Sequence, residues 1–345
     1  MSFIQTMTGG SVRYLEPVKR TQAKGLLAQT YEAIEREFAL VPPLTIQSAC
    51  PEVLAGLWIA FREVFVVDPD HRTEREIVSA GISQVNECPY CVEVHSAMLD
   101  ATGDHGLAMA IRSDGREADE NAVLQWAKAT LTPGDARLAN PPFPLRLAPQ
   151  MLGTALLFHY VNRMVSVFLD ESPSPMRFTS RIGRNLFGRV FGGTLGRRLV
   201  TVRAEAGRSL GLLDRAPLPD AFNWARPDPI IASALARFNA AVETAGGQYL
   251  PIDVRCAVTE FLDDWHGETM PLSNHWMDNA LSGIVVESDR IAARLALLTA
   301  VTPYRVERRL IEDFQAHFPG DAAIVAATAW ASLAATKRIA SWIAP

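Results

Sequence analysis

The sequence predicts a protein built almost entirely of α-helices. Ala, Leu, Arg and Glu recur with a helical period along nearly the whole chain, and segments with strand-like alternation are scarce. Several helix ends are also recognisable. Asp228 and Pro229 form an N-cap with proline at the first helical position, and Gly103 suits the left-handed position after a helix. These observations favour an all-α fold.

The helical pattern divides into thirteen segments. In chain order they cover residues 21–38, 52–66, 71–86, 89–101, 106–112, 117–130, 148–169, 228–245, 251–265, 273–284, 289–300, 304–316 and 321–343. The helix over 71–86 carries the apolar stripe Ile77, Gly81 and Val85 at intervals of four. Pro89 starts the next helix, and the Pro133-Gly134 pair marks a later loop.

Composition and charge narrow the class of protein. The 345 residues are 48% hydrophobic and 21% charged, as in a globular chain with a sizeable core. The net charge of −5 gives no general attraction to nucleic acid or to anionic membranes. The start of the chain lacks the basic and apolar regions of a signal peptide, and the apolar run 291–301 is interrupted by Arg294. We expect a soluble cytoplasmic protein.

Two parts of the chain look like diverged copies of one unit. Residues 153–163 can be laid on residues 327–337, and in both cases a preceding helix leads into a Thr-Pro turn. The alternative is a chance likeness of two buried, alanine-rich helices, which periodicity alone does not separate from duplication. Duplication predicts a redox domain over 1–170, a connector over 171–214 and a degenerate second domain without a Cys-x-x-Cys motif over 215–345.

The connector is rich in arginine and glycine. Residues 172–204 hold no Asp or Glu but contain Arg177, Arg181, Arg184, Arg189, Arg197, Arg198 and Arg203. One hypothesis is an inter-domain link whose arginines pair with acidic surface. The other is a docking strip for an acidic partner, a nucleotide or a membrane surface. The acidic balance of the whole chain favours the first.

The main chemical signal is the pair Cys88 and Cys91 followed by His95. In a helix these residues share one face, so His95 can exchange a proton with the neighbouring thiol and with Glu76 of the preceding helix. With Pro89 as the first helical residue, Cys88 is the N-cap and Cys91 lies in the first turn, where the helix dipole lowers a thiol pKa. The thiolate attacks a peroxide oxygen or a disulfide sulfur, and the second thiol closes a disulfide. Sequence alone leaves open which cysteine has which role.

Other sites fit less well. A glutaredoxin-like fold needs a strand before the cysteines, whereas residues 75–86 have helical periodicity. Zinc needs four ligands around one ion, and no second Cys/His cluster supplements this helix, so no metal site is predicted. Covalent haem needs a histidine directly after the second cysteine. The isolated Cys50 and Cys256 are expected to pack as small apolar residues.

The spacing of Glu76, the Cys88–Cys91 pair and His95 resembles the AhpD-like alkylhydroperoxidases of the carboxymuconolactone decarboxylase superfamily. The resemblance is good over about 32–169 and weak over 228–345. It implies an all-α, AhpD-like helical fold in two tandem copies, homo-oligomers, and a cofactor-free peroxidase or disulfide reductase. It further implies that Cys91 attacks the substrate, Cys88 resolves the intermediate, and Glu76 and His95 relay protons.

The chain departs from the family pattern where the best-studied members have a histidine between the cysteines, because Tyr90 stands there. A phenol cannot replace imidazole as a base near neutral pH. His159 and Arg163, one helical turn apart, are further candidates for the site.

The sequence also limits the cofactors and partners. No glycine-rich nucleotide motif follows a strand, so we expect no flavin or nicotinamide, and electrons from an external dithiol donor of lipoyl or thioredoxin type. The substrate is then an organic hydroperoxide or a partner disulfide. The alternative function is a redox-sensing or scaffolding module that oxidises slowly without turnover.

Overall fold

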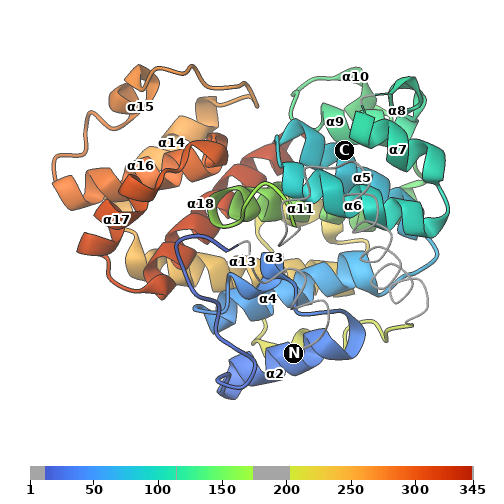
Figure 1. Ribbon diagram of the computed structural model, residues 1–345, viewed down its shortest axis with the longest axis horizontal. Coiled ribbons are helices and arrows are strands. Elements are labelled where there is room, and N and C mark those ends of the chain that lie inside the picture. Colours follow the sequence, from blue (N-terminus) through green and yellow to red (C-terminus); the bar gives the residue numbers. More distant parts are fainter. Residues whose placement is uncertain (1–11, 114, 174–202, 344–345) are drawn as a thin grey trace.

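The computed structural model describes residues 12–113, 115–173 and 203–343. These residues form helices joined by loops and contain no β-strand, apart from a single bridge between Val12 and Leu169. The prediction of an all-α fold is therefore confirmed. Figure 1 shows helices from both halves of the chain packed into one body.

The helices of the first half range from single turns to the long helix α11. They are α2 (Gly25–Glu37), α3 (Pro42–Thr45), α4 (Pro51–Phe61), the π-helix η1 (Arg62–Val66), α5 (Arg72–Val85), α6 (Pro89–Thr102), α7 (His105–Ser113), α8 (Arg116–Glu120), α9 (Ala122–Ala129), α10 (Ala136–Ala139), η2 (Leu145–Leu147) and α11 (Ala148–Phe168).

The second half begins with two short turns of helix. Its elements are η3 (Leu210–Leu212), η4 (Asp220–Ala225), α13 (Pro229–Tyr249), α14 (Ile252–Asp264), α15 (His275–Ala280), α16 (Glu287–Val301), η5 (Pro303–Arg305), α17 (Arg308–His317) and α18 (Asp321–Ile343).

Two pairs of helices join the halves. The long, buried helices α11 and α18 pack on each other in the middle of the molecule, and α4 packs along α13 (Figure 1). One continuous apolar core contains residues of both halves. The pairing of α11 with α18 joins the two segments that resemble each other in sequence, but the division into domains at 171–214 stays a prediction.

Several helices begin or end at residues other than those expected from the sequence. The segment 117–130 is broken at Asn121, whose side chain caps α9 by accepting a 2.9 Å hydrogen bond from the Leu124 amide. Helix α13 continues through Gly246 to Tyr249, and Trp330 packs so closely on Gly246 that a Cβ atom there would lie 2.4 Å from the indole. The expected helix over 273–284 is reduced to α15.

A buried cluster of charges holds η1 in place. The Arg62 guanidinium contacts Glu37 at 2.5 Å and Glu63 at 2.5 Å, and it donates a 2.6 Å hydrogen bond to the Glu205 carbonyl. Glu63 also accepts a 3.0 Å bond from the Gly207 amide. Such buried pairs are costly to break from one side, since the remaining charge loses its partner. The cluster thus fixes the end of the connector against the π-helix, which borders the candidate site.

Six of the seven arginines within residues 172–204, from Arg177 to Arg198, lie outside the described residues. Arg203 is described and exposed.

No single helix in the described part of the chain is both long and apolar enough to cross a bilayer. Helices α17 and α18 have that length and composition only when taken together, and they are bent by 115° relative to each other.

Candidate active site

The site lies between α5 and α6, and the turn between these helices sets its geometry. Glu87 adopts a left-handed conformation with φ of 51°, which turns the chain into α6. Cys88 is the N-cap of α6, Pro89 follows as the first helical residue, and Gly103 ends the helix with φ of 105°. Cys91 therefore lies in the first turn, as the sequence predicts.

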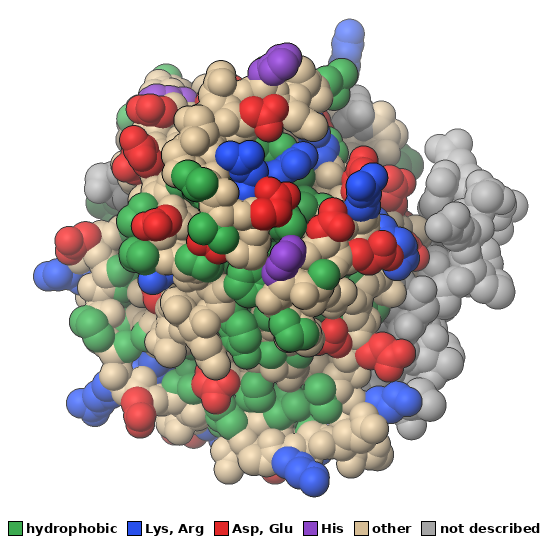
Figure 2. All heavy atoms as spheres, turned by 90° about the vertical axis from the view of Figure 1, so that its left-hand side faces the viewer, with side chains coloured by type: hydrophobic (Ala, Val, Ile, Leu, Met, Phe, Trp, Pro, Cys, Tyr) green, Lys and Arg blue, Asp and Glu red, His purple; other side chains and the backbone are tan. Residues whose placement is uncertain are grey.

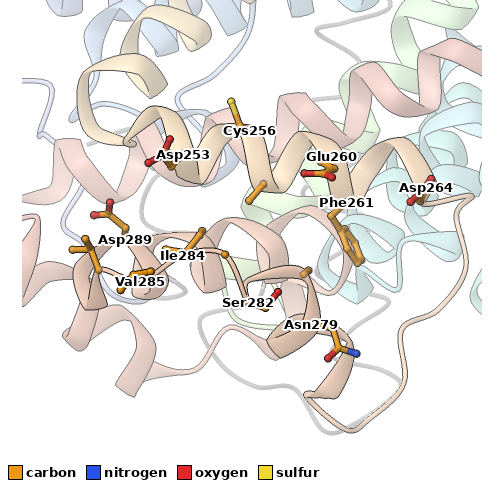
Figure 3. Close-up of a pocket in the computed structure, with 14 residues that line it drawn as sticks. Asp253, Cys256, Glu260, Phe261, Asp264, Asn279, Ser282, Ile284, Val285 and Asp289 are labelled. Carbon is orange, nitrogen blue, oxygen red and sulfur yellow. The ribbon is translucent and has the colours of Figure 1, made fainter.

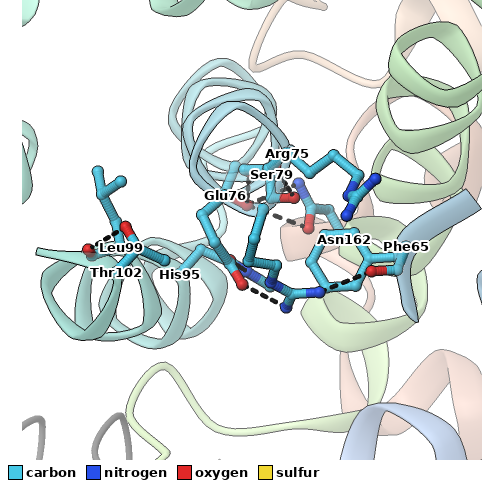
Figure 4. Close-up of polar contacts among 10 residues, drawn as sticks. Phe65, Arg75, Glu76, Ser79, His95, Leu99, Thr102 and Asn162 are labelled. Atoms are coloured by element: carbon cyan, nitrogen blue, oxygen red, sulfur yellow. Dashed lines mark hydrogen bonds and ion pairs between the residues drawn. The ribbon is translucent and has the colours of Figure 1, made fainter. Parts of the chain in front are cut away.

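The structure brings Glu76 and His95 into direct contact. His95 Nδ1 lies 2.7 Å from Glu76 Oε2, and the Glu76 side chain is fully buried (Figure 4). The imidazole is wedged edge-on between Phe65 and Phe158, with ring centroids 6.0 Å and 4.5 Å away. This packing restricts rotation of the ring. The Nδ1 atom is thereby committed to Glu76, and Nε2 is the nitrogen left for other partners.

Arg72 completes the set of buried polar groups, and sequence reasoning missed it. Its guanidinium hydrogen-bonds the Oε1 atom of Glu76, four residues later on the same helix face. It also donates a 2.6 Å bond to the Phe65 carbonyl and lies 3.9 Å from the centroid of the Phe65 ring. The i, i+4 spacing of Arg72 and Glu76 is visible in the sequence, but the burial that makes the pair matter is not.

Glu76 stays ionised because of these two partners. Burial alone would raise the carboxyl pKa, but the charge of Arg72 and the hydrogen bond and charge of His95 together hold the pKa of Glu76 below its usual value. A buried carboxylate with a cation on one oxygen and an imidazole on the other is suited to stabilise an imidazolium. The arrangement can therefore take up a proton at His95.

The prediction that the thiol at the start of α6 is activated by the helix dipole is wrong for Cys91. Cys88 and Cys91 are only 1% and 2% exposed, and neither forms a disulfide. Burial raises the pKa of Cys91 well above its usual value, and its hydrogen bond with Cys88 and the charge of Cys88 raise it further. At rest Cys91 is a neutral thiol, so its ionisation requires a base at the moment of reaction.

An apolar cavity of about 60 Å³ opens beside the thiol. Its walls come from α2, the adjoining loop, α3, α4, η1, α6 and α11: Phe38, Val41, Pro43, Leu44, Phe61, Phe65, Tyr90, Cys91, Val94, His95, Met98, Phe158 and Val161. Among these residues only Cys91, His95 and Tyr90 carry a polar group. The cavity thus presents a thiol and an imidazole to an apolar ligand.

Comparison with known proteins gives one strong match. The chain is 35% identical to an alkyl hydroperoxide reductase of Mycobacterium tuberculosis over 345 aligned positions, which cover 96% of this chain and 95% of that protein. The chain belongs to the AhpD-like alkyl hydroperoxide reductases. No family model and no solved structure matches it.

The secondary candidates of this AhpD-like chain occupy different places. Tyr90 lines the cavity, and burial, with the nearby thiols, raises its pKa well above the usual value. His159 lies apart from Glu76 and the cysteines: its Nε2 is 2.9 Å from the Thr130 hydroxyl, and its Nδ1 is 3.1 Å from the Asn86 amide nitrogen. Burial, with the charge of Arg163, lowers the pKa of His159 well below its usual value.

Arg163 points toward the second half of the AhpD-like chain. Its guanidinium donates a 2.7 Å hydrogen bond to the Ala300 carbonyl and another of 2.7 Å to the His159 carbonyl. Burial lowers its pKa to about 9. These contacts place Arg163 at the junction of α11 and α16, where it satisfies backbone carbonyls.

A larger hollow of about 630 Å³ lies in the second half of the AhpD-like chain, between α14 and the loop before α16 (Figure 3). The acidic residues Asp253, Glu260, Asp264 and Asp289 line it, and none of the described residues along it is a Lys, Arg or His. The exposed Cys256 lies at this groove, contrary to its expected burial. The groove has no imidazole to pair with that thiol, so the smaller cavity is the better candidate for thiol chemistry.

The described part of this AhpD-like chain contains no group of three or more His, Cys, Asp or Glu side chains placed to hold a metal ion. Cys50, the remaining thiol, is buried and donates a 3.2 Å hydrogen bond to the Ala322 carbonyl. Burial raises the pKa of Cys50 to about 12, so it has little thiolate character.

Proposed function

We propose that this protein reduces organic hydroperoxides through Cys91 and Cys88, with His95 and Glu76 as its proton relay. The hydrogen bond between His95 and buried Glu76, beside a cavity that also contains Cys91, is the observation that carries the proposal. The name of the relative in Mycobacterium tuberculosis supports the same activity.

Ionisation of Cys91 begins the proposed reaction. Because Glu76 binds Nδ1, the neutral imidazole carries its proton there and offers the lone pair of Nε2. His95 takes the Cys91 proton on this atom and becomes an imidazolium stabilised by the Glu76 carboxylate. A thiolate and an imidazolium replace two neutral groups, so the net charge of the buried site is unchanged.

The chemistry then proceeds in three balanced steps. The Cys91 thiolate attacks the terminal peroxide oxygen, the O–O bond breaks, and the departing alkoxide takes the proton from His95, which gives a sulfenic acid and an alcohol. The Cys88 sulfur displaces hydroxide from that sulfenic acid, so a disulfide and water form. An external dithiol reduces the disulfide by exchange and is itself oxidised.

The walls of the cavity favour a substrate with an apolar substituent. Phe38, Phe61, Phe65 and Phe158 surround the thiol, and a small polar peroxide gains little from such contacts. We therefore expect organic hydroperoxides to be better substrates than hydrogen peroxide. The electron donor we propose is a lipoyl- or thioredoxin-like dithiol, and we propose a homo-oligomeric state; both rest on the family resemblance.

The second candidate function, redox sensing, is favoured by the burial of both thiols. A bulky donor reaches a disulfide at Cys88 and Cys91 only through the small cavity or after a local opening of the helices. A protein that oxidises once and then persists as the disulfide would act as a switch rather than as an enzyme.

The two functions are separated by turnover. Wild type, Cys91→Ser and Cys88→Ser are supplied with cumene hydroperoxide and reduced dihydrolipoamide, and dithiol oxidation is followed together with intact mass. The peroxidase proposal predicts many turnovers for wild type, none for either variant, and a persistent oxidised Cys91 in Cys88→Ser. A single oxidation of wild type that no dithiol reverses would instead support the sensor. Full activity of Cys91→Ser would overturn both.

A further inference from the structure

We infer that Arg72 is a positioning residue of the proton relay: it keeps Glu76 ionised and oriented, so that His95 offers Nε2 to Cys91. The inference rests on the proposed function for its catalytic meaning. It concerns a residue outside the glutamate, cysteine and histidine constellation.

Three contacts fix the Arg72 guanidinium. The first is the hydrogen bond to the Phe65 carbonyl, at 2.6 Å. Residue 69 is a proline and has no amide hydrogen for this carbonyl near the end of η1, so Arg72 supplies a donor. The second contact is the stacking of the guanidinium 3.9 Å from the Phe65 ring centroid. The third is the ion pair with Glu76.

These contacts connect the wall of the cavity to the relay. Phe65 lines the cavity with its ring and contacts the His95 imidazole edge-on. The Phe65 carbonyl accepts a hydrogen bond from Arg72, and Arg72 binds one oxygen of Glu76 while His95 binds the other. Each group in this chain has one partner on either side, so the carboxylate has little freedom to rotate.

The other charged or titratable groups on the helices packed against α5 do not share this role. Helix α6 carries Glu93 and Asp100 besides His95, and α9 and α11 carry Lys128, His159 and Arg163. Among the described contacts, none of these five residues forms a hydrogen bond or ion pair with Glu76. Arg75 is the neighbour on α5 itself: its guanidinium is fully buried, lies 3.7 Å from Asp68, and makes no hydrogen bond to a described residue. Arg72 and His95 are therefore the two groups that bind the carboxylate directly.

Loss of the Arg72 charge would change which nitrogen of the His95 imidazole carries the hydrogen. Burial would then dominate and raise the pKa of Glu76, so the carboxyl would be protonated at a higher pH than in the wild type. A neutral carboxylic acid donates an O–H hydrogen bond to the Nδ1 lone pair, which places the hydrogen of the neutral imidazole on Nε2. In that tautomer His95 cannot accept the Cys91 proton.

Three substitutions test this role. Arg72→Gln keeps hydrogen-bond donors but removes the charge, Arg72→Lys keeps the charge, and Arg75→Gln removes a buried charge one residue away without a hydrogen bond to Glu76. For each variant, the rate of Cys91 oxidation by tert-butyl hydroperoxide is measured against pH. Circular dichroism checks that the helices remain folded.

We expect Arg72→Gln to lower the rate near neutral pH about 10²-fold and to move the acid limb of the profile upward by about 1 to 3 pH units. Arg72→Lys should retain the wild-type limb and recover most of the rate, and Arg75→Gln should retain both. If Arg72 only supported folding, Arg72→Gln would lower the rate of Cys91 oxidation at every pH but leave the acid limb of the profile in place. An unmoved limb in folded Arg72→Gln, or an equal shift in Arg75→Gln, would overturn the inference.

A parallel measurement separates this inference from the proposed function. The pH profile of Cys91 alkylation by iodoacetamide, followed by peptide mass, reports on the same relay without any peroxide. If wild type does not turn over hydroperoxide but Arg72→Gln still shifts the alkylation profile, the proposed function fails and the positioning role stands. If wild type turns over hydroperoxide but Arg72→Gln shifts neither pH profile, the proposed function stands and the positioning role fails.

Discussion

Helices pack against one another in both halves of the molecule, but the packing buries the polar groups in the first half and leaves an open groove in the second. In the first half, α5 is covered along its length by the 14-residue α6, and the cover buries Glu76 and both thiols. In the second half, α14 packs on α16 as α5 packs on α9, but its contact with the six-residue α15 is slight and a groove remains (Figure 3).

This difference shows that burial, rather than residue type alone, distinguishes the carboxylate and thiol of the candidate site from those of the groove. Glu260 and Cys256 on α14 are exposed, whereas Glu76 and Cys91 lie at the contact between α5 and α6. Figure 2 shows the face of the second half, where hydrophobic side chains lie among Asp and Glu side chains. Although α15 begins at His275, no histidine is among the described residues that line the groove, so the acidic groups of α14 have no imidazole there to orient.

The largest expected effect distinguishes the thiols of the two halves. Cys91→Ser should abolish hydroperoxide turnover because serine cannot form the sulfenic acid, whereas Cys256→Ser should leave the rate unchanged. The measurement is dithiol oxidation driven by cumene hydroperoxide. Loss of activity in Cys256→Ser would show that the second half takes part in the chemistry.

The two carboxylates provide the next comparison. Glu76→Gln should lower the rate of Cys91 oxidation about 10²-fold, because a neutral amide does not stabilise the imidazolium. Glu260→Gln, an identical change on the exposed face of α14, should have no measurable effect. If Glu76→Gln oxidises at the wild-type rate, His95 works without its carboxylate and the relay is wrong.

Alkylation without peroxide tests the consequence of burial. Because Cys91 is buried and its pKa is raised, while Cys256 is exposed, iodoacetamide near pH 7.5 should label Cys256 first, by a factor of about 10 or more. Peptide mass mapping at several times gives both rates. Preferential labelling of Cys91 would mean that the thiol is activated at rest and would restore the helix-dipole hypothesis.

The smallest effect concerns stability against acid. The pKa of Glu76 is lowered in the folded protein, so its ionised form stabilises the fold above the pKa of an unfolded glutamate, about 4.3, and this contribution is lost as pH falls through the folded value. Urea midpoints should therefore fall less between pH 6 and pH 3.5 in Glu76→Gln than in wild type. Glu260→Gln should follow the wild-type dependence.

Local signals in the sequence predict much of the fold and part of the site. Apolar periodicity identifies the long helices, and Pro89 and Gly103 mark the ends of α6. The spacing of Glu76 and His95 suggests their contact, because both lie on consecutive helices joined by a short turn. These features depend on neighbours in the sequence and on simple packing of an apolar face.

The features that sequence did not predict depend on tertiary packing. The depth of Cys91 is set by helices and loops far along the chain, so the direction of its pKa shift was predicted wrongly. The need for glycine at position 246, inside α13, comes from the close packing of Trp330, eighty-four residues later. The role of Arg72 depends on the end of η1, a π-helix without a clear sequence signal.

The most direct test of the account is the location of the oxidised sulfur after one equivalent of cumene hydroperoxide. Cys88→Ser is the protein to use, since the sulfenic acid then has no resolving partner and can be trapped with dimedone. Peptide mapping should find the adduct at Cys91, with Cys50 and Cys256 unmodified. An adduct at Cys256, or no adduct at Cys91, would contradict the claim that the apolar cavity lined by Cys91 and His95 of α6 is where this protein reduces hydroperoxides.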